Sequence, residues 1–355
     1  MTGPTGKDGL SPNNFDLLRL LASLQVLVNH TTWHLEIPTP GWWWLINSFP
    51  GVPIFFVISG FLISASYERS TSLVSYARNR ILRIYPGLWA CVLVTIPVAM
   101  YFGFHFVNWS GLAWLPAQFV GLIYTPEFLE GFGFGSYNGS LWTIPIELQF
   151  YVLLPLMYLA LSRTGRLTQA IVYVWLAFVV LAFIFRPMIV VDDGHPEPLN
   201  LKLLRYSFIP HFYLFLLGVL LQRFQIHKSP LIRGKALFWL AGYVAAMFLV
   251  PGSWVKDVLY PMILGVVVVS VAYTSINLSR WVLRGNDLSY GVYIYHGLVL
   301  NVFVELRLLA APFYAVGVAL ITCGLAAISW KLVERPFLRR KRQSIHGIPE
   351  ASRTP

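Results

Sequence analysis

The first strongly apolar segment, residues 15–33, contains ionisable side chains that are costly inside a membrane. Arg19 and His30 are eleven positions apart, so a helix places them on nearly the same face, roughly 16 Å apart along its axis. An imidazole titrates near neutral pH and suits general base catalysis, and a guanidinium binds phosphate. This spacing indicates a functional polar face. The alternatives are a water-satisfied interfacial histidine and a snorkelling arginine.

A carboxylate occurs in a later apolar segment, residues 141–161, where Glu147 follows Trp142 by five positions. If this segment is a helix entered from outside, Glu147 lies about two turns deep, close to the depth expected for His30. Pro145 lacks a backbone donor and is expected to free a carbonyl near this carboxylate. The alternative is that Glu147 pairs with an arginine.

Small and basic residues form two further motifs. Ser59 and Gly60 interrupt an apolar run and would let another backbone or a thin ligand approach closely. Arg80 and Arg83 are three positions apart, so a helix would place both on one face, where they could bind phosphates. Retention of basic loops in the cytoplasm explains these arginines equally well.

Two more histidines lie in apolar segments. His296 follows a Ser-Tyr-Gly sequence near the end of the chain and is a second candidate for the functional face. His211 is interpreted as structural.

The composition predicts an all-α, polytopic membrane protein with about ten transmembrane helices. Hydrophobic residues make up 57% of the 355 positions and charged residues 12%, against roughly 25% charged in a soluble domain. A helix needs about 20 residues to cross the hydrocarbon core. The apolar segments that approach this length are 15–33, 49–67, 84–104, 141–161, 170–186, 206–222, 236–250, 258–275, 288–306 and 313–330. Residues 112–124 are short and contain Pro116, which favours a re-entrant or interfacial segment.

The distribution of basic residues predicts that both termini are cytoplasmic. With the N-terminus inside, 20 of the 26 Lys and Arg residues fall on inner segments, as the positive-inside rule requires. The net charge of +11 is then explained by topology and anionic lipids, and nucleic-acid binding is not indicated. Cys91 and Cys323 lie in apolar segments and are expected to be buried thiols.

We expect one membrane-embedded domain, residues 15–333, between an N-terminal tail, residues 1–14, and a basic C-terminal tail, residues 334–355. No signal peptide is recognised, so the first helix is expected to be retained. The acidic loop 187–200, which contains Asp192, Asp193 and Glu197, and the glycine-rich stretch Gly131–Gly139 are expected to determine specificity for the bound molecule, because loops carry such differences.

Taken in order, these motifs resemble acyltransferase family 3, a large family of bacterial integral-membrane acyltransferases, over nearly the whole chain. The motifs are Phe15-Asp16-x-Leu18-Arg19 with His30, the stretch from Val52 to Leu62, Arg80-x-x-Arg83-Ile84-x-Pro86, Leu141-Trp142-Thr143 with Glu147, Ser289-Tyr290-Gly291 through His296, and Glu334-x-Pro336-Phe337. The chain departs from the family at Pro145, where a serine and no proline is more usual.

The resemblance implies transfer of an acyl group, most often acetyl, from a cytoplasmic acyl-coenzyme A to a hydroxyl of a glycan or lipid-linked glycan at the outer face of the bacterial inner membrane. Acetyl-coenzyme A would be a donor substrate, with no permanently bound cofactor and no metal. By this resemblance, Arg19, Arg80 and Arg83 would bind the phosphorylated end of the donor, with Ser59 beside it.

The same resemblance implies that His30 is the catalytic base or an acyl carrier and that Glu147 positions the imidazole or the acceptor. Asp16, Trp142 and His296 would shape the site. Some relatives carry an additional extracytoplasmic esterase-like domain. We expect this chain either to complete the transfer itself or to pass the group to a separate partner.

The competing hypothesis is a membrane transporter or flippase of a polar or lipid-linked solute, because buried ionisable groups and interrupted helices also occur in secondary transporters. Only an acyltransferase would need an acyl-coenzyme A and leave an ester. The sequence does not determine the oligomeric state.

Overall fold

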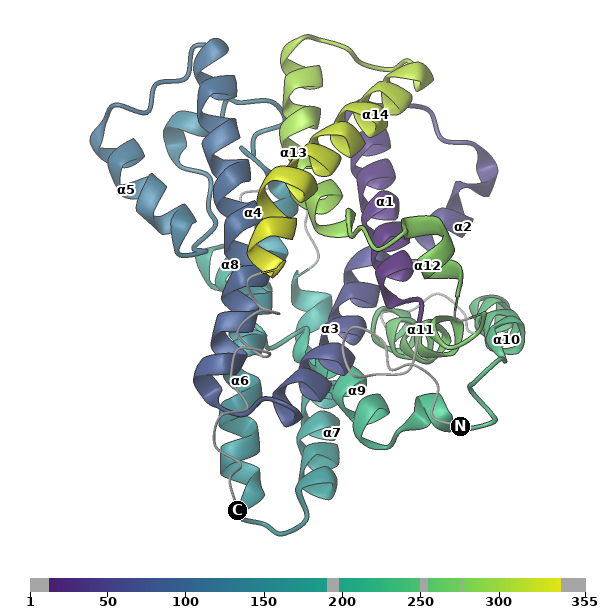
Figure 1. Cartoon of the computed structure of the whole chain (residues 1–355). Coiled ribbons are helices and arrows are strands. Elements are labelled where there is room, and N and C mark those ends of the chain that lie inside the picture. Colours follow the sequence, from purple (N-terminus) through teal and green to yellow (C-terminus); the bar gives the residue numbers. More distant parts are fainter. Residues whose placement is uncertain (1–12, 190–197, 250–254, 276, 340–355) are drawn as a thin grey trace. The chain divides into compact units, whose positions relative to one another are not determined.

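A computed structural model describes residues 13–189, 198–249, 255–275 and 277–339. These residues form helices and connecting loops, and no strand occurs among them (Figure 1). The predicted all-α class is confirmed. The predicted loop residues Asp192, Asp193 and Glu197, and most of both predicted tails, lie outside the described residues.

The helices follow the apolar segments of the sequence. They are α1 (Phe15–His34), α2 (Trp44–Asn47), α3 (Gly51–Glu68), α4 (Leu73–Tyr101), α5 (Trp109–Phe119), α6 (Thr143–Ser162), α7 (Leu167–Phe185), α8 (Leu199–Arg205), α9 (Phe212–Arg223), α10 (Ala236–Leu249), α11 (Lys256–Ala272), α12 (Leu278–Leu283), α13 (Ser289–Glu305) and α14 (Pro312–Ser329).

Five helical segments of the described chain are long and apolar enough to cross a membrane, which makes this a multi-pass membrane protein. They are Gly41–Glu68, Leu73–Tyr101, Gly139–Ser162, Leu167–Ile189 and Pro312–Arg339. Among the other predicted spans, α9 and α10 have only 12 and 14 residues. The total of ten crossings and the orientation of the termini stay predictions.

Two helix boundaries change the interpretation of predicted segments. The span expected to begin at residue 84 belongs to α4, which begins at Leu73, so Arg80 and Arg83 lie within a continuous helix. The short run near Pro116 forms α5, an 11-residue helix, which is too short to cross a bilayer.

The chain divides into two compact units, each of which contains separate stretches of sequence. Unit 1 consists of Met1–Asn29, Thr39–Ser70 and Trp142–Ser289. Unit 2 consists of His30–Pro38, Thr71–Leu141 and Tyr290–Pro355. Helix α1 contributes residues to both units. The expectation of one domain over residues 15–333 stays a prediction.

In unit 1, α9 packs directly against α3. The residues from Phe212 to Leu221 are all buried, as expected for a helix that is apolar all round. A Cβ added at Gly60 of α3 would lie 1.9 Å from the Phe215 carbonyl oxygen, and one at Gly218 of α9 would lie 2.1 Å from the Val57 carbonyl oxygen. The prediction that Gly60 permits close approach of a backbone is confirmed.

In unit 2, α13 packs against both α4 and α14. A Cβ at Gly87 of α4 would lie 2.7 Å from the Tyr290 ring, and a Cβ at Gly291 would lie 2.8 Å from the Ala326 Cα. The Tyr290 hydroxyl donates to the Ile84 carbonyl at 2.8 Å. Small residues and one hydrogen bond therefore fix the start of α13 against its neighbours.

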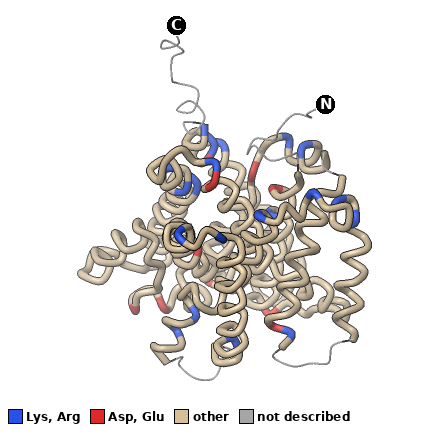
Figure 2. The backbone as a smooth tube through the Cα atoms, turned by 90° about the horizontal axis from the view of Figure 1, so that it is seen from below, with Lys and Arg blue, Asp and Glu red and all other residues tan. Residues whose placement is uncertain are grey.

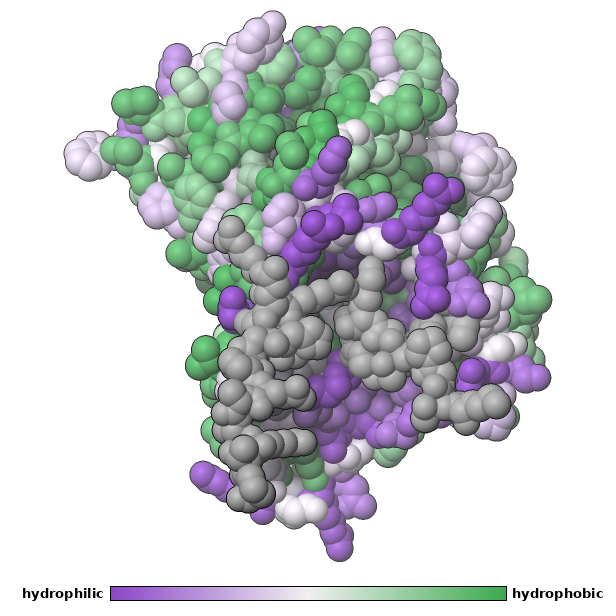
Figure 3. Space-filling model, in the orientation of Figure 1, coloured by the Kyte–Doolittle hydropathy of each residue, from purple (hydrophilic) through white to green (hydrophobic). Residues whose placement is uncertain are grey.

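The surface is that of a membrane protein. Lys, Arg, Asp and Glu lie in short stretches of the chain, and the rest of the trace consists of other residues (Figure 2). The face drawn in Figure 3 carries broad areas of hydrophobic side chains. On α7, Tyr173, Leu176, Val180 and Ile184 are exposed and recur at three- or four-residue intervals, so they form one stripe along the helix. Lipid chains would cover such a stripe.

Candidate active site

In unit 2, His30 of α1 and His296 of α13 form a hydrogen-bonded pair. The distance from His30 Nδ1 to His296 Nε2 is 3.1 Å. His296 Nδ1 lies 3.2 Å from the Val292 carbonyl oxygen, one helical turn earlier. His296 has no solvent exposure, whereas His30 is half-buried. The structure thus brings together two of the predicted site residues.

A third histidine that sequence reasoning did not select lies beside this pair. His34, the last residue of α1, has its ring centroid 5.9 Å from that of His30 in an edge-on arrangement. Its other neighbour is Phe134, whose ring stacks on the imidazole with a centroid distance of 3.8 Å. His30 and His34 have the four-residue spacing of one helix face, which is a signal that the sequence already contained.

Phe134 belongs to the glycine-rich loop (residues 131–139), which α13 holds through two polar side chains. Glu305 accepts a hydrogen bond from the Gly133 backbone N–H at 2.7 Å. Asn301 accepts from the Phe134 N–H at 3.2 Å and donates to the carbonyls of Ser136 and Tyr137, both at 2.8 Å. Gly133 has φ +61°, a conformation that favours glycine.

The end of the same loop is attached to α13 next to His296. Asn138 donates to the Ile294 carbonyl at 2.8 Å, and the Cys91 thiol donates to that carbonyl at 3.2 Å. A Cβ at Gly297 would lie 2.2 Å from Asn138 Oδ1, so a glycine is required there for this approach. The loop expected to contact the acceptor is therefore fixed to the helix that carries His296.

Arg80 and Arg83 lie in α4 of unit 2, on one helix face as predicted. Both side chains are half-buried. The Arg80 guanidinium carbon lies 6.0 Å from the centroid of the Tyr76 ring, and that of Arg83 lies 5.9 Å from the Tyr290 ring centroid. Each is at the outer limit of a cation–π contact.

In unit 1, Arg19 of α1 forms an ion pair with Asp287, which sequence reasoning missed. The distance from Arg19 Nη1 to Asp287 Oδ2 is 3.4 Å. The other carboxylate oxygen accepts from the N–H of Ser289, the first residue of α13, at 3.2 Å and from its hydroxyl at 2.6 Å. No local sequence signal joins residues so far apart.

Glu147 lies in the first two turns of α6 in unit 1. It accepts a hydrogen bond from the Tyr151 hydroxyl at 2.5 Å, and the Ser59 hydroxyl lies 3.5 Å from the same oxygen. Pro145 is the third residue of α6, where backbone N–H groups have no partner within the helix. The helix therefore accommodates this departure from the family pattern, and the expectation that Pro145 frees a carbonyl near Glu147 stays a prediction.

The remaining predicted residues have different surroundings. The Trp142 ring centroid lies 5.7 Å from that of His211, whose Nε2 is 3.0 Å from the Arg205 carbonyl oxygen. This packing agrees with a structural His211. Asp16 lies in the first turn of α1 and is half-buried. Glu147 and His30 belong to different units, so positioning of His30 by Glu147 stays a prediction.

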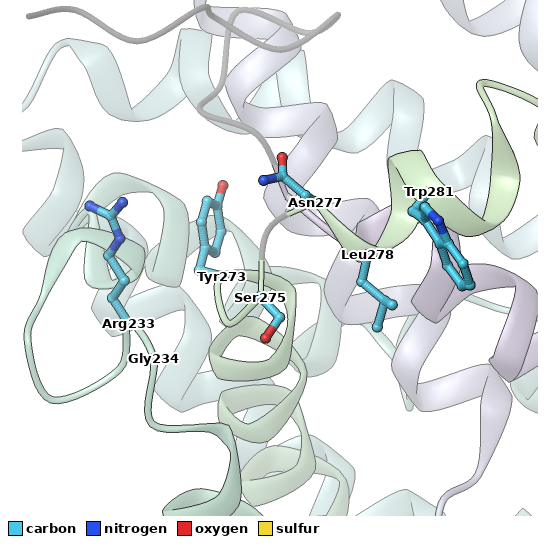
Figure 4. Close-up of a pocket in the computed structure, with 7 residues that line it drawn as sticks. All are labelled: Arg233, Gly234, Tyr273, Ser275, Asn277, Leu278 and Trp281. Atoms are coloured by element: carbon cyan, nitrogen blue, oxygen red, sulfur yellow. The ribbon is translucent and has the colours of Figure 1, made fainter.

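An open cavity of about 630 Å³ in unit 1 includes none of the predicted site residues. Arg233 and Tyr273 lie on one side, Leu278 and Trp281 on the other, and Asn277 between them (Figure 4).

The order of the motifs agrees with a comparison of the whole chain with protein families. The acyltransferase domain family matches residues 13–331. This protein therefore belongs to that family, and it is an acyltransferase.

Several curated relatives cover the same region. The chain is 33% identical to nodulation protein 10 of Rhizobium leguminosarum bv. viciae, over 92% of this chain and 93% of that protein. It is 29% identical to an O-acetyl transferase of Shigella phage Sf6, over 92% and 96%.

A more distant relative is the peptidoglycan O-acetyltransferase OatA of Listeria monocytogenes serovar 1/2a, with 22% identity over 91% of this chain and 55% of that longer protein. No solved structure gives a significant match to this chain.

Proposed function

We propose that this acyltransferase transfers an acetyl group from acetyl-coenzyme A to a hydroxyl of a glycan or lipid-linked glycan, with His30 as the catalytic base. The observation that carries the proposal is the hydrogen bond between His30 and the fully buried His296. An imidazole held in this way is suited to remove a proton from a hydroxyl. The names of two relatives support an O-acetyl product.

The reaction needs no reactant other than the acceptor hydroxyl and acetyl-coenzyme A. The acceptor hydroxyl gives its proton to His30 as its oxygen attacks the thioester carbonyl carbon. The carbon–sulfur bond then breaks, and the proton passes to the leaving thiolate to give coenzyme A. An acetyl-His30 intermediate is the alternative route with the same products.

Basic residues would bind the donor. Arg80 and Arg83 share a face of α4, and Arg19 lies on α1, the helix that also carries His30. Guanidinium groups bind phosphates in two-pronged geometry. We therefore assign these arginines to the phosphates of coenzyme A and place Ser59 near the donor, with Glu147, Trp142 and Asp16 shaping the site.

The acceptor would approach from the outer face. The peptidoglycan named in one relative is a glycan, and the glycine-rich loop lies against His34 beside His30. We propose ten crossings, cytoplasmic termini, and a location in the bacterial inner membrane, where a donor made inside meets an acceptor outside. Residues 15–333 would form the catalytic membrane domain, with short tails at either side.

The test is transfer of labelled acetyl from acetyl-coenzyme A to a panel of surface glycans by purified protein in lipid. His30→Ala is expected to lower ester formation by about 10²- to 10⁴-fold, the usual contribution of a general base, while donor binding is retained. Equal activity in the variant would remove His30 from the chemistry. No binding of acetyl-coenzyme A and no ester on any glycan of the panel would overturn the proposed donor.

A further inference from the structure

We propose that His296 is a positioning residue that fixes the tautomer of His30, so that Nε2 of His30 is the nitrogen that accepts the hydroxyl proton. The inference rests on the proposed role of His30 as base. It goes beyond that role because it assigns a proton to each ring nitrogen of the pair and gives the second histidine a defined task.

The contact made by Nδ1 of His296 determines which nitrogen of that ring is protonated. This nitrogen lies 3.2 Å from the Val292 carbonyl oxygen, and a carbonyl oxygen can only accept a hydrogen bond. Nδ1 of His296 therefore carries a hydrogen. An imidazolium would be costly at a position with no solvent exposure, so the resting ring is neutral and its Nε2 has a lone pair.

The contact between the two rings then determines the tautomer of His30. His296 Nε2 and His30 Nδ1 are 3.1 Å apart, and a hydrogen bond needs one donor. Because His296 Nε2 is the acceptor, His30 Nδ1 must carry the hydrogen. In a neutral imidazole the other nitrogen is then unprotonated, which leaves the lone pair of His30 on Nε2.

This arrangement favours catalysis because the hydrogen bond between the two rings strengthens when His30 is protonated. When His30 Nε2 takes a proton, the ring becomes a cation and its Nδ1–H becomes a charge-assisted donor to His296. This hydrogen bond is stronger in the transition state than in the resting enzyme. Its loss should therefore lower kcat and leave KM nearly unchanged.

His296 itself is not the base in this arrangement. Both of its ring nitrogens are engaged, Nδ1 by Val292 and Nε2 by His30, and the ring is inaccessible to solvent. His30 is half-buried, and it has one nitrogen left for the substrate.

Three substitutions of His296 test the inference in the acetyl-transfer assay. His296→Leu keeps a similar volume but has no acceptor, and we expect kcat to fall roughly 10- to 100-fold, the effect of losing a hydrogen bond to a charged group. His296→Gln can place its amide oxygen near the position of Nε2 and should restore most of kcat. His296→Asn is too short to reach His30 and should resemble the Leu variant.

A buried histidine elsewhere provides the control. His227 is 6% exposed, lies in unit 1, and stacks on Tyr273. Burial, together with the charge of Lys228, lowers the pKa of His227 to about 4, so His227→Gln removes no charge at neutral pH. This variant should show the generic cost of replacing a buried imidazole while kcat stays close to that of the native protein.

The tautomer can be measured without any assay of activity. In protein labelled with ¹⁵N-histidine and embedded in lipid, the ring signals absent from His30→Gln belong to His30. We expect them to show a protonated Nδ1 and an unprotonated Nε2, and His296→Leu should remove this preference.

The outcomes separate this inference from the proposed function. A protonated Nε2 on His30, or a His296→Leu variant with native kcat, would overturn the role of His296 even if acetyl transfer depends on His30. Failure of the native protein to form an ester would overturn the proposed function, and the ¹⁵N spectra would still decide whether His296 sets the tautomer.

Discussion

Glu147 and Asp287 in unit 1 and the histidine pair in unit 2 have hydrogen-bond partners of different kinds. In unit 1 the carboxylates are paired with cations or hydroxyl donors: Asp287 with Arg19, and Glu147 with Tyr151. At the histidine pair of unit 2, imidazole bonds to imidazole, and the glycine-rich loop beside it is held by the neutral Asn301 and by the carboxylate of Glu305. The contrast is therefore between two carboxylates with cationic or hydroxyl partners in unit 1 and a pair of imidazoles in unit 2.

The carboxylates of unit 1 and the histidine pair of unit 2 differ in how they respond to a proton. A carboxylate that is held by a guanidinium has its charge stabilised and gains little by accepting a proton. An imidazole can accept a proton at its unprotonated nitrogen while its N–H donates a stronger, charge-assisted hydrogen bond. We therefore expect the Arg19–Asp287 pair of unit 1 to act as fixed charges, and the histidine pair of unit 2, the unit that also contains Arg80 and Arg83, to exchange a proton.

The largest effect is expected from a substitution that disturbs the packing of α3 against α9, which would test whether the stability of unit 1 depends on that contact. Gly60→Ala places a Cβ 1.9 Å from the Phe215 carbonyl oxygen, so the helices must separate. We expect a loss of about 3 kcal/mol or more, at the upper end for overpacking, measured as a lower melting temperature in lipid.

Gly242 provides the matched control, because it lies in α10 of the same unit and a Cβ there meets nothing within 4 Å. Gly242→Ala should preserve or slightly raise the melting temperature, since alanine favours helix. Equal melting temperatures for the two variants would show that the close contact between α3 and α9 does not contribute to stability.

The same contact illustrates what could be predicted from the sequence. Apolar runs and the small residue Gly60 predicted helices and a close approach, because both depend on local composition. The spacing of Arg80 and Arg83 predicted one helix face, which the structure confirms. These features need only the helical period.

Contacts between distant segments could not be predicted in this way. Asp287 pairs with Arg19 across 268 positions, and Asn301 reaches the glycine-rich loop across about 165. Neither residue stands out in the sequence, since Asp287 follows a short turn and Asn301 lies in an apolar helix. Tertiary packing alone selects such partners, whereas His34 could have been found from its spacing to His30.

An intermediate effect is expected from loosening the glycine-rich loop in unit 2. Asn301→Leu keeps the approximate volume but removes three hydrogen bonds, to Phe134, Ser136 and Tyr137. Unsatisfied buried groups cost about 1–3 kcal/mol each, although the loop can relax toward solvent, so we expect a net loss of about 2 kcal/mol. The proposed acceptor role predicts a higher KM for the glycan and an unchanged KM for acetyl-coenzyme A.

Asn47→Leu provides the corresponding control at an exposed asparagine of unit 1. It should change neither KM. If Asn301→Leu raised the KM for the donor instead, the glycine-rich loop would belong to the donor side, and the contrast between fixed charges in unit 1 and an acceptor-facing unit 2 would fail.

The smallest effect is expected from a substitution that removes the Arg19–Asp287 ion pair and keeps the hydrogen bonds to Ser289. In Asp287→Asn the amide oxygen can still accept from the N–H and hydroxyl of Ser289, whereas the amide nitrogen cannot accept from Arg19. The two side chains are 20% and 12% exposed, so we expect a loss of about 1 kcal/mol, between the values for surface and buried pairs.

Kinetics then decide what Arg19 does. If Arg19 binds donor phosphate, Asp287→Asn leaves the guanidinium available and the KM for acetyl-coenzyme A stays constant or falls, whereas Arg19→Gln raises it. If the pair is only structural, both variants lose stability to a similar extent and neither changes the donor KM. The second result would limit phosphate recognition to Arg80 and Arg83, so that unit 2 alone would supply both the donor-binding cations and the proton-transfer pair.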